Sequence, residues 1–233
     1  MSNPSLLLWL EAPLQAWGHD SKFGRRDTLN FPTKSGVLGL VCCALGAGGE
    51  QRELLAEFAP LNQSVVAYAR QNHDGLNAER EPLLRDFHMV GSGYDNQNPW
   101  QKLLIPKTSE GNPAVGGGSK MTYRYYLQDM AFAVVLEVPQ IMAAELAEHL
   151  QNPVWDLYLG RKTCVPTDFI YRGLFSDAAE ALFAAESLAS SKNLAEDFRV
   201  LSGEHEGEVL TLNDVPLQFG EHKLYRDRRV TVI

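Results

Sequence analysis

The sequence has few cysteines and no residues spaced as metal ligands. Its three cysteines are Cys42, Cys43 and Cys164, and no two of them form a C-x-x-C pair. This spacing argues against a disulfide framework and against a zinc site. The six histidines form neither an H-E-x-x-H motif nor a comparable cluster, so we expect no metal and no other cofactor.

The sequence also lacks long apolar runs and the motifs of nucleotide-using enzymes. No apolar stretch approaches the roughly 20 residues of a membrane helix, and the first residues lack the basic region of a signal peptide. There is no phosphate loop, no G-x-G-x-x-G motif and no nucleophile motif, which argues against a small-molecule enzyme. We therefore expect a cytoplasmic protein with no membrane partner.

Acidic residues outnumber basic ones, and the formal net charge is −8. That sum by itself argues against a nucleic-acid partner, but the charges are unevenly distributed. Acidic side chains concentrate late in the chain, at Asp177, Glu180, Glu186, Glu196, Asp197, Glu204, Glu206 and Glu208. Basic side chains gather elsewhere, at Lys22, Arg25, Arg26, Lys34, Lys102, Lys107, Lys120, Arg124, Arg161, Lys162, Arg226, Arg228 and Arg229. A protein with one basic and one acidic face would have such a sequence, and so would a protein with neither.

The stretch 31–40 (FPTKSGVLGL) is predicted to lead an extended segment into a helix. Pro32 fixes its own backbone angle and holds the preceding residue extended, and Thr33 is a suitable N-cap. The apolar pattern predicts a helix over 35–45. Two interpretations of its start remain open. Lys34 and the first-turn amides could hold a phosphate, or the segment is an ordinary core helix in tight contact with a sheet.

The apolar runs predict an α+β fold with a ferredoxin-like (RRM-like) β-α-β-β-α-β core. Its predicted strands are 5–10, 64–70, 131–138 and 169–175, and its predicted helices are 35–45 and 140–150. Further predicted elements are helices at 50–58 and 178–188, strands at 83–90, 122–126, 208–212, 216–219 and 228–233, and a long loop at 11–30. An antiparallel sheet with helices on one face is a common platform for single-stranded RNA, although a fold alone does not establish a function.

Residues 91–121 differ in composition from the segments on either side. They are rich in glycine and proline and contain three consecutive glycines at 116–118. We interpret them as a projecting hairpin or as an insertion that becomes ordered on binding. The chain then divides into a ferredoxin-like domain at 1–175, with this insertion at about 91–121, and a small β-rich C-terminal extension at 176–233 that packs on it.

Four segments occur in an order and at a spacing that resemble one family. They are 13–18 (PLQAWG), 31–40 (FPTKSGVLGL), 85–88 (RDFH) and 158–166 (YLGRKTCVP). Together they are similar to the CasD subunit of Cascade, the type I-E CRISPR RNA-guided surveillance complex. The resemblance runs from about Leu6 to about Pro166, with a looser fit to the C-terminus. It implies membership of the repeat-associated RNA-binding superfamily, with a ferredoxin-like palm and a thumb hairpin formed by the insertion.

The resemblance also implies a function without catalysis. A CasD-like subunit holds the 5′ handle of the guide crRNA and caps the backbone filament of the complex. Its implied partners are the crRNA, the Cascade backbone subunit and the Cascade large subunit, with target DNA reached only indirectly through the complex. The segment 122–126 (TYRYY) matches the thumb base of the family, which makes Arg124 the first choice for a base or phosphate contact.

The chemistry of RNA binding points to further candidate residues. Handle binding requires cations that neutralise phosphates and planar groups on which splayed bases stack. The candidate RNA-binding residues are Gln15, Trp17, Arg25, Arg26, Lys34, Ser35, Arg124, Arg161 and Lys162. Some have simpler explanations, because Trp17 also suits a core anchor and the pair Arg161 and Lys162 also suits a solvated surface.

The main alternative function is a metal-independent endoribonuclease that processes CRISPR repeat RNA. Relatives in another CRISPR subtype cut the repeat themselves, whereas a separate subunit does so in the type I-E systems that this sequence resembles. The chemistry needs a base for the 2′-hydroxyl and an acid for the leaving oxygen. His88, Tyr123 and Lys120 are candidates for these roles, although His88 equally suits a hydrogen-bonded structural histidine.

Overall fold

The computed structural model describes residues 3–19, 21, 24–91, 107–112, 114 and 119–233. The helices are α1 (Lys34–Leu45), α2 (Arg52–Phe58), α4 (Ala143–Gln151) and α5 (Ala178–Ser191). The strands are β1 (Ser5–Gln15), β2 (Arg25–Arg26), β3 (Gln63–Arg70), β4 (Leu84–Val90), β5 (Lys120–Glu137), β6 (Tyr171–Phe175), β7 (Leu194–Ser202), β8 (Glu208–Gln218) and β9 (Leu224–Val232). In this part of the chain, no helix is both long enough and apolar enough to cross a membrane.

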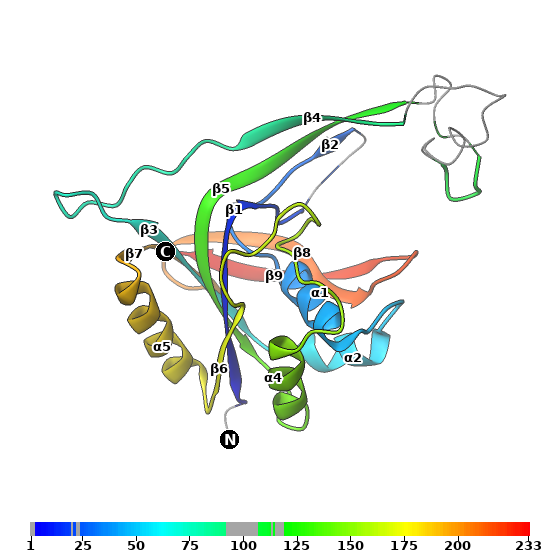
Figure 1. The fold of residues 1–233 in the computed structure, drawn as a ribbon. Helices are drawn as coiled ribbons and strands as arrows, with labels where there is room; N and C mark the ends of the chain where they lie inside the picture. The colour runs from blue at the N-terminus through cyan, green and yellow to red at the C-terminus, as the bar shows by residue number, and fades with distance from the viewer. Residues whose placement is uncertain (1–2, 20, 22–23, 92–106, 113, 115–118) are drawn as a thin grey trace.

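One large antiparallel sheet carries the fold, with the strand order β6-β1-β5-β3-β7-β9-β8 (Figure 1). Its centre is the pair β1 and β5, in which Leu6 lies opposite Leu136 and Leu8 opposite Val134. These strands are continuous apolar runs because both of their faces are buried, so the alternation of a half-exposed strand is absent. The strands predicted at 5–10 and 64–70 each lie within a strand of the structure, and the one predicted at 131–138 is present as far as Glu137.

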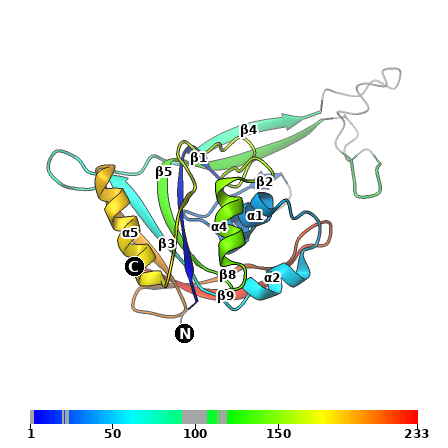
Figure 2. The same cartoon turned by 60° about the horizontal axis from the view of Figure 1, so that its bottom comes forward.

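Helices cover both faces of the sheet. Alternate residues of β1 point to opposite sides, so Leu6 and Leu8 pack in the cluster that includes α1, α2 and α4. Leu7 and Trp9 pack in a second cluster, under the alanines of α5. Figures 1 and 2 both show α5 across the sheet from the other helices. The two predicted core helices, α1 and α4, lie on one face, whereas α5 covers the face that an open RNA platform would offer.

The C-terminal extension continues the sheet rather than forming a separate layer. β7 pairs with β3, for example Val66 with Arg199, and the hairpin of β8 and β9 follows beyond it. The strands predicted at 208–212 and 216–219 are a single strand, β8, with Pro216 inside it. The sequence pattern misses β7 because Val200 is its only fully buried position, which leaves too little apolar periodicity to indicate a strand.

Strand β5 extends beyond the sheet into a projecting arm. The sequence predicts two strands, 122–126 and 131–138, but the structure has one strand of 18 residues. Asp129, with φ at 48°, interrupts its regular conformation between the two halves. The outer half pairs with β4, from Leu84 opposite Tyr126 to Val90 opposite Lys120. We call β4 together with residues 120–126 the arm (Figure 1).

The predicted insertion and the predicted loop are only partly described. The two strands of the arm flank the insertion predicted at 91–121, of which residues 92–106, 113 and 115–118 lie outside the described residues. The loop predicted at 11–30 is in part regular, because β1 continues to Gln15 and β2 pairs in parallel with β5. In that pairing Arg25 lies opposite Tyr123 and Arg26 opposite Arg124.

A candidate nucleic-acid interface at the base of the arm

Lys34 lies inside the protein, although it is one of the predicted RNA-binding residues. Only 2% of its surface is exposed. Its Nζ donates to the carbonyl oxygens of Ala59 at 3.2 Å and Leu61 at 2.5 Å, beyond the end of α2. Burial, together with the nearby Arg228, lowers the pKa of Lys34 to about 8. The ammonium therefore ties two helices together and does not reach the surface.

The first turn of α1 already holds an anion, the carboxylate of Asp214 from β8. The backbone N–H of Lys34 donates to Oδ2 of Asp214 at 2.8 Å. Arg228 donates to both oxygens of this carboxylate, at 2.7 and 2.9 Å. The N–H of Gly36 donates to the Thr33 hydroxyl, which is the predicted N-cap. This arrangement agrees with the core-helix interpretation, because the Asp214 carboxylate occupies the place that a phosphate would take at this helix start.

Gln15 and Trp17 are also fully buried. Gln15 Nε2 donates to the carbonyl oxygens of Leu10 and Met130, and Trp17 Nε1 donates to Gln15 Oε1 at 3.1 Å. The Trp17 ring packs on Gly36, where an added Cβ would lie 2.8 Å from the ring. This contact explains a helix-weakening glycine at that position. Both side chains fix the end of β1 against β5 and α1, so Trp17 is a core anchor.

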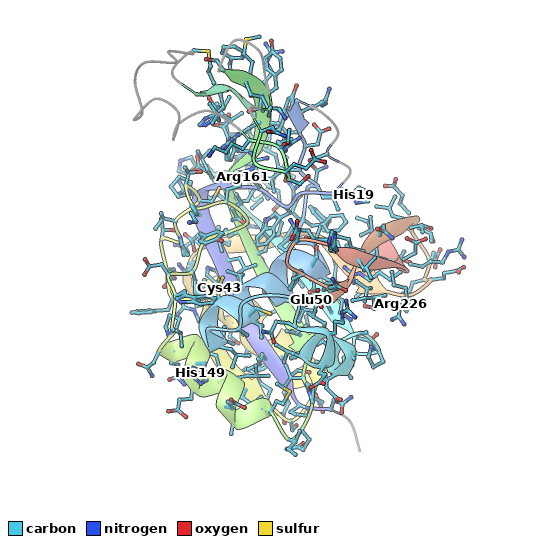
Figure 3. All side chains as sticks on the ribbon, turned by 90° about the vertical axis from the view of Figure 1, so that its right-hand side faces the viewer. His19, Cys43, Glu50, His149, Arg161 and Arg226 are labelled. Carbon is cyan, nitrogen blue, oxygen red and sulfur yellow. The ribbon has the colours of Figure 1, made fainter. Side chains whose placement is uncertain are left out.

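The other predicted cations come together at the base of the arm. They derive from β2, from β5 and from the loop 158–166, and we call them the basic cradle: Arg25, Arg26, Arg124, Arg161 and Lys162. Arg161 connects the three segments, because it donates to the carbonyl oxygens of Tyr125 at 3.3 Å and Arg26 at 3.1 Å. Its guanidinium also lies 4.6 Å from the centre of the Tyr126 ring. Figure 3 labels Arg161 below the arm.

Local contacts hold Arg25 and Arg124. The Arg25 guanidinium lies 4.7 Å from the Tyr125 ring centre and forms an exposed ion pair with Asp27. Arg124 donates from Nε to the Thr122 hydroxyl at 3.4 Å, and it lies opposite Asp86 across the arm. A shallow depression in the surface is lined by Arg124, Tyr158, Gly160, Arg161, Lys162 and Thr163. Arg124, Arg161 and Lys162 therefore line one accessible depression, whereas Arg25 packs on Tyr125, which points to the other face of β5.

A close backbone contact sets the position of the loop that carries Arg161. Gly160 has φ at 90°, and a Cβ there would lie 1.7 Å from the carbonyl oxygen of Ala16. The neighbouring Leu159 accepts a hydrogen bond from the Ala16 N–H, and its own N–H donates to Cys164. Because only glycine fits this approach, the segments 13–18 and 158–166 form one unit. Ser35 lies apart from the cradle, beside Gly18 and His19.

Sequence reasoning missed the tyrosines and an arginine that line the arm. Arg85 lies opposite Tyr125, and Phe87 lies opposite Tyr123, so these residues share one face of the arm. The Arg85 guanidinium is 5.7 Å from the Tyr123 ring centre. The sequence signal for these residues is the alternation of side-chain types, with a period of two residues, along the segments 83–90 and 122–126. It becomes informative only when the pairing of the two strands is known.

The chain belongs to the class of CRISPR-associated proteins. Residues 5–231 match the family described as "CRISPR-associated protein (Cas_Cas5)", and the chain belongs to this family. It is similar to the "CRISPR system Cascade subunit CasD" of Escherichia coli (strain K12), with 31% identity over 188 residues. That match covers 78% of this chain and 76% of the relative. The resemblance to the CasD family is thus confirmed.

Two solved structures resemble the whole chain. A chain of a "CRISPR RNA-guided surveillance complex" has a TM-score of 0.69 and 30% identity, over 98% of this chain and 89% of that chain. The "Crystal structure of Cas protein" has a TM-score of 0.59 and 27% identity, over 98% of this chain and 93% of that chain. The similarity therefore includes the C-terminal strands as well as the core.

Proposed function

We propose that this protein is a non-catalytic subunit of a Cascade surveillance complex and that it holds the 5′ handle of the crRNA in the basic cradle. The observation that carries the proposal is that Arg124, Arg161 and Lys162 line one depression, where Arg161 also donates to the backbone carbonyl oxygens of Tyr125 and Arg26. Lysine and arginine neutralise phosphates, and guanidinium planes and aromatic rings stack on splayed bases. The relative named as a Cascade subunit supports the same function.

The arrangement of the core supports a ferredoxin-like palm. Its strand order is β6-β1-β5-β3, and every neighbouring pair in that order is antiparallel. Helix α1 lies between β1 and β3 in the chain, and α4 lies between β5 and β6. We propose that residues 1–175 form the palm, that the arm is the base of the thumb, and that 176–233 is an extension specific to this family.

The partners follow from the proposed function. A subunit that caps the backbone filament contacts the crRNA, the Cascade backbone subunit and the Cascade large subunit, and it meets target DNA only through the complex. A net charge of −8 suits such a shared role, because the cradle needs to neutralise only a short part of the guide. We place the protein in the cytoplasm, where such complexes would meet foreign DNA.

The predicted site residues divide into two groups. We propose that the five cations of the cradle contact RNA directly, with Arg124 and Arg161 at its centre. Gln15, Trp17 and Lys34 act through the backbone that they position, because their side chains are buried. Ser35 is half-buried at the start of α1 and stays a candidate for a contact at the edge of the bound RNA.

The geometry of the arm disfavours the endoribonuclease alternative. His88 lies opposite Thr122, whereas Tyr123 lies opposite Phe87. Because successive residues of a strand point to opposite faces, His88 and Tyr123 point away from each other across the arm. The His88 ring instead has Nδ1 3.6 Å from the Asp86 carboxylate. His88 and Tyr123 on opposite faces do not serve one scissile phosphate, whereas Lys120, opposite Val90, lies on the face of His88.

The proposal is tested by RNA binding and RNA integrity in the same sample. The purified chain is incubated with labelled repeat RNA in EDTA, analysed on a denaturing gel and titrated at several salt concentrations. We expect intact RNA, weaker binding by Arg124→Ala and Arg161→Ala, and a salt slope reduced by about one for each lost phosphate contact. Arg229→Ala is the matched control, because Arg229 is an exposed arginine on β9 paired with Glu204.

Two results would contradict the proposal. One is binding that is equally strong in wild type and in both cradle variants. The other is a discrete cut in the RNA that disappears in His88→Ala, which would make the protein a processing enzyme.

A further inference from the structure

An apolar groove lies next to the basic cradle, between the end of α1 and the loop that follows α4. It has a volume of about 750 Å³ and is lined chiefly by Cys43, Val154, Trp155, Tyr158, Lys162 and Val165. Trp155 is 48% exposed, and Val154 and Val165 are exposed as well. The other described tryptophans, Trp9 and Trp17, are fully buried. Figure 3 shows this side of the molecule, with Cys43 below Arg161.

The backbone that carries Trp155 is fixed to the last turn of α1. The N–H of Val154 donates to the Ala44 carbonyl at 2.9 Å, and that of Trp155 donates to the Cys43 carbonyl at 3.3 Å. The indole ring rests against Gly48, where a Cβ would lie 3.3 Å from the ring. A half-exposed aromatic side chain on a rigid support loses little conformational freedom when a ligand stacks on it.

The groove and the cradle share a wall. Tyr158 and Lys162 line the groove, and both also line the depression that contains Arg124 and Arg161. An aromatic surface therefore continues directly into a cluster of cations. This combination matches a nucleotide, which joins a flat ring to a phosphate over a short distance. Proteins that bind single strands use this same pairing of stacking residues with a positive groove.

We propose that the groove takes one unstacked base of the RNA that lies in the cradle. Trp155 provides the stacking face, Tyr158 forms the wall, and Lys162 neutralises the phosphate next to the base. Asp156 also lines the groove, and its carboxylate can accept a hydrogen bond from the amino group of a base. This inference rests on the proposed function, because it assumes that RNA occupies the cradle.

The cations of the shared wall favour a nucleotide over an apolar peptide. A hydrophobic segment of a partner protein would fill the groove but would leave the charges of Lys162 and Arg161 without anionic partners. A nucleotide satisfies both halves of the surface at once. Stacking on an aromatic side chain tolerates every base, so the groove sets the position of the chain more than its sequence.

The test combines variants of Trp155 with repeat RNAs that each lack one base. The affinity of the full-length chain is measured for intact handle RNA and for a series with a single abasic nucleotide moved along the handle. We expect Trp155→Ala to weaken binding of intact RNA roughly 10- to 100-fold and Trp155→Phe to retain most of the affinity. For one abasic position, Trp155→Ala should cause no further loss. Phe183→Ala on α5 is the control, because Phe183 is an exposed aromatic residue on the opposite face.

Three outcomes separate this inference from the proposed function. If Arg124→Ala weakens binding but Trp155→Ala does not, the groove proposal fails and the proposed function stands. If the wild-type chain does not bind the RNA, the proposed function fails. If Trp155→Ala leaves RNA binding unchanged but releases another subunit from the assembled complex, the groove docks protein and the inference is overturned. An unchanged melting temperature shows that the variants are folded.

Discussion

Two lysines that the sequence analysis predicts to bind RNA have different environments in the structure, because Lys34 is buried and Lys162 is exposed. Lys34 is the first residue of α1 and is buried, whereas Lys162 follows Arg161 in a loop and lines the surface. The difference comes from their neighbours. The start of α1 receives the carboxylate of Asp214, so its charges are balanced inside the protein. In the loop of Lys162, Gly160 lies against the carbonyl of Ala16, just after β1, and Lys162 is exposed.

The comparison teaches that a cation near a helix start is not by itself a phosphate site. The amides of a helix N-terminus attract any anion, and a protein carboxylate held by an arginine is already in place. An external anion can bind a helix N-terminus only where no protein carboxylate already accepts from its amides. The predictions that follow test this difference at its strongest point first.

The largest effect is expected when the internal anion is removed. Asp214→Ala leaves Arg228 and the Lys34 N–H without their shared acceptor, and breaking a buried pair in this way costs about 3–5 kcal/mol. Urea unfolding should show a loss of this size in the free energy of unfolding. Asp227→Ala is the control, because Asp227 is exposed on the neighbouring strand β9 and should change stability by less than about 0.5 kcal/mol. Equal losses in both variants would show that the helix start does not depend on Asp214.

A second prediction concerns the loop of the cradle. Gly160→Ala places a Cβ against the Ala16 carbonyl at a strained φ, so the loop must move and Arg161 must lose its hydrogen bonds. We expect a cost of roughly 1–3 kcal/mol in stability and an RNA affinity as low as that of Arg161→Ala. Gly75→Ala is the matched control, since Gly75 also has positive φ but has no atom within 4 Å of the added Cβ. Its RNA affinity should equal that of wild type.

The smallest effect is a pH dependence caused by Lys34. The folded protein releases this proton near pH 8, whereas the unfolded chain holds it up to about 10.5. Between these pH values the unfolded state binds more protons, so the contribution of Lys34 to stability rises with pH, by at most about 1.4 kcal/mol per pH unit. Below pH 8 both states are protonated and the contribution is constant.

The measurement is the difference in unfolding free energy between wild type and Lys34→Met from pH 7 to 10. Other groups that titrate in this range are present in both proteins and cancel in the difference. A difference that stays flat from pH 8 to 10 would show that buried Lys34 keeps its ordinary pKa. The RNA affinity of folded Lys34→Met should equal that of wild type, in contrast to Lys162→Met.

The sequence predicts the parts of this fold that depend on local pattern. The apolar strands and the helix over 35–45 could be predicted because their side chains alternate or recur within one element. Of the cradle, Arg161 and Lys162 lie in a segment that resembles the family and Arg124 lies in the matching segment 122–126, whereas Arg25 and Arg26 could be predicted from their charge alone. Long-range partners could not be predicted, because Asp214 reaches Lys34 across 180 positions of the chain. The continuity of β5 was hidden by Asp129, whose unusual φ no sequence pattern indicates.

The continuity of β5 has a mechanical consequence. A single strand runs from the centre of the sheet into the arm, so we expect the arm to pivot near Asp129, where the strand is irregular. Next to Asp129, Gln15 Nε2 donates a hydrogen bond to the carbonyl oxygen of Met130 at 2.7 Å. A buried side chain is therefore expected to set the angle at which the arm leaves the sheet. Small changes at Gln15 would be magnified into large displacements at the far end of the arm.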